Sequence, residues 1–202
     1  MNIMGRLRGL ILFFCFFLII PGCSVVKEGK QIAALAKCDF RILSVTNLHL
    51  LGISVQNITS INDLNLIDAQ QLIRGVMAPK APLTFFLNVE AKNPNTDAAG
   101  MKKLEWILFI DDIRMTEGSV DEEVMIPPNN GVVTIPVRVS ADLKKVLQGK
   151  SMDAILNFGM NLAGIGNKPT RFLIKIKPTI MIGKKSIVYP GYINVKTEYT
   201  SQ

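Results

Sequence analysis

Residues 83–139 constrain the fold of this 202-residue chain more than any other segment, because apolar and polar residues alternate along them. The alternation forms three runs, at residues 83–91, 104–110 and 133–139. A period of two residues is typical of a β-strand with one face buried and one face in water. These short runs therefore predict amphipathic strands of an antiparallel sheet.

The segments between these runs contain residues that stop strand pairing. Asn93, Pro94 and Asn95 follow the first run, and Asp111-Asp112 follow the second. Proline has no N–H for a β-ladder, and asparagine side chains hydrogen-bond to the backbone in turns. Gly118 and the segment 126–131 (Ile-Pro-Pro-Asn-Asn-Gly) divide the stretch before the third run. The sequence thus predicts turns at these places.

This order of strands and turns resembles the type 2 late-embryogenesis-abundant (LEA) family, also described as the water-stress and hypersensitive-response (WHy) domain. The similar segments are 89–95, 104–112, Gly118, 126–131 and 135–137, which together cover roughly a third of the chain. The resemblance implies an immunoglobulin-like or fibronectin-III-like β-sandwich with a helix beside it. It also implies a link to desiccation and osmotic stress. Asn93, Pro94 and Asn95 are the family-motif residues, with an expected structural role.

The remaining periodicity agrees with a mainly β fold. Two alternating runs lie within residues 39–57, with candidate bends at Asn47 and Gly52, and further strands are expected at 172–179 and 193–199 as sheet edges. Helical spacing predicts helices at 141–147 and 152–162, and one from Leu66 that ends at Pro79, that Asn65 caps and that closes an open end of the sandwich. We therefore expect an antiparallel sandwich of about seven strands with one or two accessory helices.

The N-terminus has the pattern of an export signal. Arg6 and Arg8 precede an apolar run at 10–20, which is shorter than the roughly 20 residues that a membrane-spanning helix needs. Residues 20–23 (Ile-Pro-Gly-Cys) resemble a bacterial lipobox, and this resemblance implies lipidation of Cys23. Pro21 departs from the lipobox pattern. An ordinary signal peptide or an uncleaved anchor is the alternative.

These features predict three parts of the chain: a lipoprotein signal peptide at 1–22, a lipidated tether at 23–38 and the LEA type 2-like domain at 39–202. Ser24 follows the cysteine where, in the lipoproteins that this segment resembles, aspartate would mark retention in the inner membrane, so the resemblance implies an outer-membrane anchor in a Gram-negative host. After Cys15 is removed and Cys23 is lipidated, Cys38 is alone and forms no internal disulfide. We expect it to behave as a small apolar core residue.

The net charge of +7 does not predict nucleic-acid binding. It falls to +5 (21 basic against 16 acidic residues) once Arg6 and Arg8 are removed with the signal. The excess lysines are dispersed, whereas nucleic-acid binding favours a clustered basic patch. Lys175 and Lys177 alternate with apolar residues, which indicates the solvent face of a strand. A modest attraction to anionic lipid headgroups is the functional alternative.

We expect no catalytic, metal or cofactor site. His49 is the single histidine, and with Cys38 it makes too small a set for a metal. The acidic pairs 111–112 and 122–123 fall at turns or strand edges, although a glycan- or lipid-cleaving enzyme would need two carboxylates across a cleft. The favoured hypothesis is a non-enzymatic, lipid-anchored envelope protein, either a binding module or a protective one linked to water stress. The alternative is a docking subunit of an envelope complex, without nucleic-acid partners.

Overall fold

The computed structural model describes residues 34–56, 58, 63, 65–148, 150–162, 169–182 and 185–199. The strands in these ranges are β1 (Asp39–Leu50), β2 (Ile53–Ser54), β3 (Pro82–Asn93), β4 (Ala99–Met101), β5 (Lys103–Ile110), β6 (Ile113–Val120), β7 (Val124–Ile126), β8 (Gly131–Asp142), β9 (Thr170–Ile182), β10 (Lys185–Val188) and β11 (Ile193–Tyr199). The helices are α3 (Leu66–Met77), α4 (Leu143–Val146) and α5 (Met152–Leu162).

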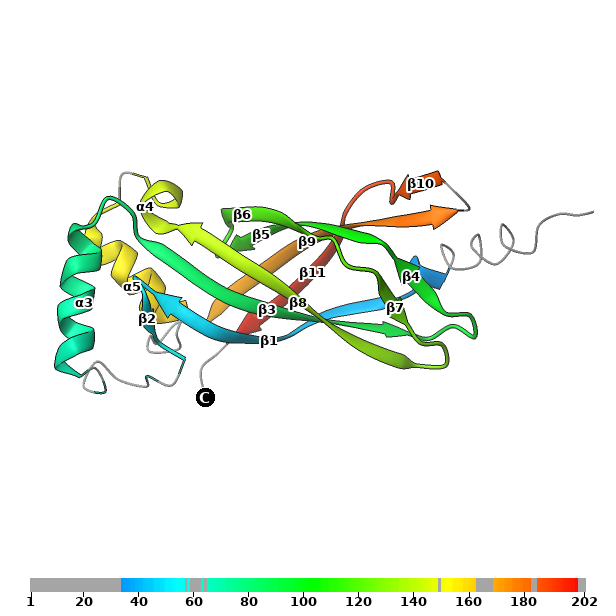
Figure 1. Cartoon of the computed structure of the whole chain (residues 1–202), viewed down its shortest axis with the longest axis horizontal. Coiled ribbons are helices and arrows are strands. Elements are labelled where there is room, and N and C mark those ends of the chain that lie inside the picture. The colour runs from blue at the N-terminus through cyan, green and yellow to red at the C-terminus, as the bar shows by residue number, and fades with distance from the viewer. Residues whose placement is uncertain are drawn as a thin grey trace, which may run out of the picture.

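The strands form two main antiparallel sheets, which confirms the mainly β fold (Figure 1). One sheet has the order β2-β1-β3-β8, and the other has the order β10-β9-β5-β6 with β11 also paired to β9. A small β4-β7 ladder stands apart from both. The sheets pack face to face, since the ring of Phe85 in β3 meets the ring of Phe172 in β9 edge-on at 6.5 Å.

The predicted strand at 83–91 lies at the centre of the first sheet. β3 pairs with β1 on one side and with β8 on the other. Its alternate residues are all buried in the core: Leu83, Phe85, Leu87, Val89 and Ala91. The alternation arises because successive side chains of a strand point to opposite faces, and here one face meets the second sheet.

The second sheet differs from the prediction in the position of β9. Residues 172–179 were expected at a sheet edge, but β9 is an interior strand that pairs with β5 along one side. On its other side, β10 pairs with residues 179–182 and β11 with residues 170–176. β9 is 13 residues long, so two short strands share one of its edges. The separate strand β10 was not predicted.

The predicted bends in residues 39–57 lie within a longer first strand. β1 continues through Asn47, which has a φ of 53°, and its register with β3 shifts between Thr46 and His49. The chain then turns at Leu51 and Gly52 (φ 86°) into β2. Both predicted bends are therefore confirmed, whereas the two expected runs are one strand and a two-residue partner.

The helix α3 begins and ends where the sequence predicts. The Asn65 side chain accepts a hydrogen bond from the Asp68 N–H at 2.9 Å, and the helix ends just before Pro79. It packs against the core through Leu72 and Gly75, and a Cβ on Gly75 would lie 2.7 Å from the Cβ of Leu51. The strongly apolar stripe of the helix is turned to solvent instead of toward the sandwich.

The folded domain includes residues just before β1. Ala34 and Leu35 belong to the hydrophobic core, at the opposite end of the molecule from α3 (Figure 1). The predicted signal peptide and Cys23 lie outside the described residues. Among the described residues, no helix is long and apolar enough to cross a membrane.

Candidate functional site

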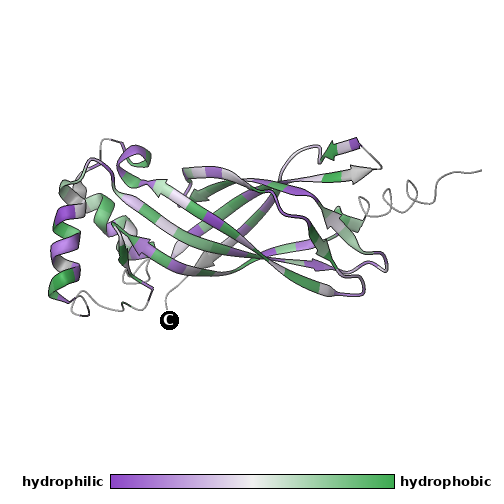
Figure 2. Ribbon diagram, in the orientation of Figure 1, coloured by the Kyte–Doolittle hydropathy of each residue, from purple (hydrophilic) through white to green (hydrophobic). Residues whose placement is uncertain are grey.

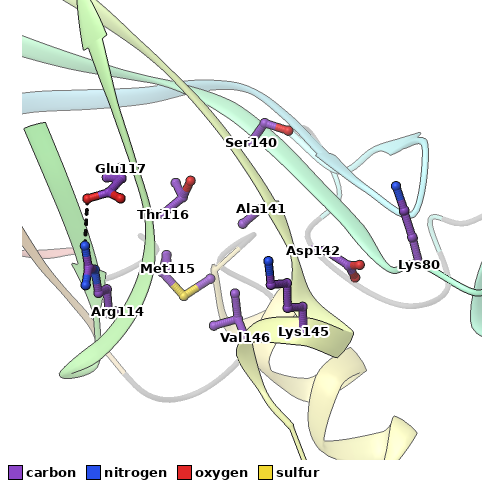
Figure 3. Close-up of a pocket in the computed structure, with 10 residues that line it drawn as sticks. All are labelled: Lys80, Arg114, Met115, Thr116, Glu117, Ser140, Ala141, Asp142, Lys145 and Val146. Atoms are coloured by element: carbon purple, nitrogen blue, oxygen red, sulfur yellow. Dashed lines mark hydrogen bonds and ion pairs between the residues drawn. The ribbon is translucent and has the colours of Figure 1, made fainter.

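A groove opens where the two sheets separate between β6 and β8 (Figure 3). Each of these strands pairs with a single neighbour, β6 with β5 and β8 with β3, so each leaves one edge outside the ladders of the described chain. The groove has a volume of about 820 Å³. We call it the β6–β8 groove; its lining residues are Lys80, Arg114, Met115, Thr116, Glu117, Ser140, Ala141, Asp142, Lys145 and Val146.

A local irregularity in β6 shapes the floor of the groove. Leu108 pairs with Thr116 and Phe109 pairs with Arg114, so Met115 is an extra residue on β6. Its side chain is buried, and Val146 from α4 lies across the groove from it (Figure 3). The floor is therefore apolar and adaptable in shape.

The lining of the groove has three cationic side chains and two carboxylates. Arg114 pairs with Glu117 at 2.6 Å. The Asp142 carboxylate accepts hydrogen bonds from the N–H groups of Ala81 (2.9 Å) and Lys144 (3.2 Å). Both carboxylates of the lining are thus engaged. Lys80 and Lys145 form no ion pair with any residue that the structure describes, which leaves two cations facing the open space.

This arrangement suits binding of a ligand with an anionic group and an apolar part. Ammonium groups attract anions, while a partly buried apolar floor favours contact with hydrocarbon. The described lining includes no histidine or cysteine, and its hydroxyls are those of Thr116 and Ser140. The groove therefore provides groups that can recognise such a ligand.

The motif residues Asn93, Pro94 and Asn95 lie at the far end of the same sandwich, away from the groove. Asn93 is fully buried. Its Nδ2 donates to the carbonyl oxygens of Asp97 (2.9 Å) and Ile126 (3.2 Å), and its Oδ1 accepts from the N–H (3.0 Å) and the Nδ2 (2.7 Å) of Asn95. All four hydrogen-bonding positions of this amide are used inside the protein.

The same motif connects three segments that are distant in sequence. The Nδ2 of Asn95 donates to the Ala34 carbonyl at 2.9 Å. In the turn before β8, the N–H of Asn129 donates to Asn95 O (2.7 Å) and that of Asn130 donates to Asn93 O (2.8 Å). Both turn residues have positive φ, a conformation that asparagine tolerates.

The other candidate residues have ordinary structural environments. His49 makes one hydrogen bond, between Nδ1 and the Asn47 carbonyl at 2.9 Å. Burial, and secondarily the charge of Asp39, raise the pKa of Cys38 to about 11, and the Cys38 thiol donates to the Ala34 carbonyl at 3.4 Å. Asp112 pairs with Arg171 at 2.9 Å. No group of three metal-binding side chains occurs among the described residues.

Two side-chain arrangements of the second sheet were not predicted. Trp106 in β5 lies opposite Gly118 in β6, and a Cβ on Gly118 would lie 2.6 Å from the Cζ2 of the indole. On the outer face, Lys175 and Lys177 lie over the rings of Phe109 and Tyr192, at 5.1 and 5.4 Å from the ring centroids. The strand register was needed to find both, because each pair is distant in sequence.

Comparison with known proteins gives similarity in structure only. No protein-family model matches the chain, and no curated protein sequence matches it. A protein from Archaeoglobus fulgidus is similar over 62% of this chain and 89% of its own, with 16% identity and a TM-score of 0.35. AT1g01470 from Arabidopsis thaliana is similar over 58% of this chain and 70% of its own, with 13% identity and a TM-score of 0.37. At2g46140.1, described as a late-embryogenesis-abundant protein, is similar over 88% of this chain and 80% of its own, with 11% identity and a TM-score of 0.38.

Proposed function

We propose that this chain is a non-enzymatic, lipid-anchored binding module of the bacterial cell envelope, held in the outer membrane by Cys23 and linked to water or osmotic stress. The β6–β8 groove is the observation that supports a binding role most directly, because Lys80 and Lys145 stand unpaired, within the described chain, above an apolar floor. The motif-like order of residues 83–139 supports the stress link.

The proposed anchor leaves the domain room to act at the membrane surface. Residues 24–33 separate Cys23 from the first described core residue, Ala34. Ten residues reach at most about 35 Å when fully extended. The tether would therefore keep the domain near the membrane that holds the lipid. The Ser24 after the cysteine supports the outer membrane as that membrane.

The anchor is tested by intact mass and membrane fractionation of the native protein beside Cys23→Ala. We expect a lipid-sized mass increment on the native chain. The Cys23→Ala variant should leave the membrane fraction and appear in the soluble fraction. Cys38→Ala is the matched control and should fractionate like the native protein, because the Cys38 thiol donates a hydrogen bond to the Ala34 carbonyl within the domain. A native chain without added mass would exclude the anchor.

The groove is tested in a deletion strain that is complemented with charge-reversed variants. Lys80→Glu/Lys145→Glu should lose survival after drying and osmotic upshift, since it replaces two cations of the groove with carboxylates. Lys92→Glu/Lys196→Glu reverses the same charge on exposed strand positions outside the groove and should behave like the native chain. Equal survival of the deletion and parent strains would contradict the stress role, and equal survival of both variants would contradict the groove's part in it.

A docking subunit of an envelope complex is the second candidate, and β10 supports it. All four residues of β10 are exposed, including Ile187 and Val188, and β10 pairs with β9 on one side only. An exposed apolar edge can accept a strand from another protein. Crosslinking in intact envelopes should then recover a heteromer that Ile187→Lys weakens. Recovery of the monomer alone, from native and variant cells, would exclude this candidate.

A further inference from the structure

The helix α3 lies at one end of the molecule (Figure 1), and its ribbon carries both hydrophobic and hydrophilic residues (Figure 2). Its large apolar side chains are among the most exposed in the described structure. We call this set the α3 apolar face: Leu66 (76% exposed), Ile67 (66%), Ile73 (63%) and Met77 (82%). Leu66, Ile73 and Met77 are spaced by seven and four residues, so they form one stripe along the helix.

The stripe is exposed because the opposite side of α3 is fixed to the domain. Gly75 allows close contact with Leu51, and Leu72 packs against the core. Asn65 caps the first turn, and the Lys144 ammonium donates to the carbonyl of Ala78 just after the last turn. Both ends and one side of the helix are thus held, so the apolar face cannot turn inward without breaking these contacts.

The charged residues of α3 lie on different sides of the helix. Asp68 is the one carboxylate of the helix, and it lies seven residues from Gly75, on the side that faces the domain. On the exposed side, Arg74 is the charged residue of the helix; the exposed Asp63 precedes the helix and the exposed Lys80 follows it. An exposed apolar stripe that is flanked by a cation, with the carboxylate of the helix on its other side, suits a helix that lies in a membrane interface.

We propose that the α3 apolar face binds the surface of a phospholipid bilayer that contains anionic lipids. Leu66, Ile73 and Met77 enter the boundary between headgroups and acyl chains, and Arg74 pairs with lipid phosphates. A symmetric contact with a second copy fits less well, because it would bring two Arg74 side chains together, while the carboxylate of the helix, Asp68, lies on its other side. A helix of 12 residues, about 18 Å long, is also short for an interface of roughly 800 Å² per partner.

This membrane contact is additional to the proposed anchor. It lies at the opposite end of the domain from Ala34, where the chain arrives from Cys23 (Figure 1). It is also independent of the anchor, because the side chains of α3 would meet lipid whether or not Cys23 is modified. Failure of the lipidation test would therefore leave this proposal open to its own experiment.

The experiment places a tryptophan on α3 of the full-length chain. The protein carrying Ile73→Trp is reconstituted with vesicles of phosphatidylcholine and phosphatidylglycerol whose acyl chains are brominated, and quenching of tryptophan fluorescence is measured. The native chain gives the baseline, since Trp106 is buried inside the domain. Val132→Trp is the matched control, because Val132 is an exposed apolar residue of β8 away from α3.

We expect stronger quenching for Ile73→Trp than for Val132→Trp. The added substitutions Leu66→Gln and Met77→Gln should return the Ile73→Trp signal to the native baseline, and both replace exposed side chains that the fold does not need. Quenching should weaken in vesicles of phosphatidylcholine alone. Equal quenching at positions 73 and 132, or none at position 73, would overturn the proposal. A dimer in detergent that Ile73→Gln dissociates, without quenching, would overturn it in favour of a second copy.

Discussion

Replacing Asn93 with alanine should destabilise the domain far more than the loss of one small amide group suggests. The substitution removes hydrogen bonds to three backbone groups: the carbonyls of Asp97 and Ile126 and the N–H of Asn95. Each such bond contributes about 1 kcal/mol net, and more when its partner is left buried and unpaired. We therefore expect Asn93→Ala to lower the free energy of unfolding by about 3 kcal/mol. That is a large fraction of the roughly 5–15 kcal/mol of a typical domain.

Urea denaturation followed by circular dichroism measures this loss, and an unchanged m-value would show that the unfolded states are comparable. Asn88→Ala is the matched control. The Asn88 amide donates to the hydroxyls of Ser44 (3.0 Å) and Thr46 (3.2 Å), but it lies on the half-exposed outer face of β3, where water can replace it. We expect a loss below about 1 kcal/mol there. A loss for Asn93→Ala no larger than that for Asn88→Ala would refute the reasoning.

Three further predictions follow from single contacts. A Cβ on Gly118 would lie 2.6 Å from Trp106, so Gly118→Ala should cost about 1–3 kcal/mol in urea denaturation and shift the tryptophan fluorescence; an unchanged protein would contradict this contact. The hydrogen bond from Arg41 holds the pKa of Glu90 below its ordinary value, so the stabilisation is present above the pKa of the unfolded chain and is lost as pH falls through the folded pKa. Arg41→Gln should raise the pKa of Glu90 in an NMR titration, and equal pKa values in both proteins would exclude the pair. Since burial raises the pKa of Cys38 from 9.0 to about 11, alkylation at pH 8, followed by peptide mass mapping, should be about 100-fold slower than for an unperturbed thiol; a comparable rate would contradict that burial.

The sequence by itself determined the features that depend on neighbouring residues. Period-2 alternation located β3, β5 and β8, because a strand places successive side chains on opposite faces wherever it pairs. The cap at Asn65 was likewise predictable, because its side chain bonds to an N–H only three residues away. The lipid anchor at Cys23 also remains a prediction from local sequence.

The tertiary structure alone decided which residues meet across the chain. The spacing of Leu66, Ile73 and Met77 predicted a helix but not that this stripe would face solvent. The side of the helix that packs against the domain is set by the close contact between Gly75 and Leu51, which are distant in sequence. The β6–β8 groove likewise depends on where two sheets diverge, and its cations come from three separate segments.

The central place of β9 illustrates the same limit. Its alternation is the same for an edge strand and an interior strand, since only one face of each is buried in a sandwich. Pairing with β5, β10 and β11 is set by long-range backbone hydrogen bonds, and these leave no periodic trace in the sequence of β9 itself. Local patterns therefore specified the elements of this protein, and the pairing between distant strands specified its groove and its exposed helix face.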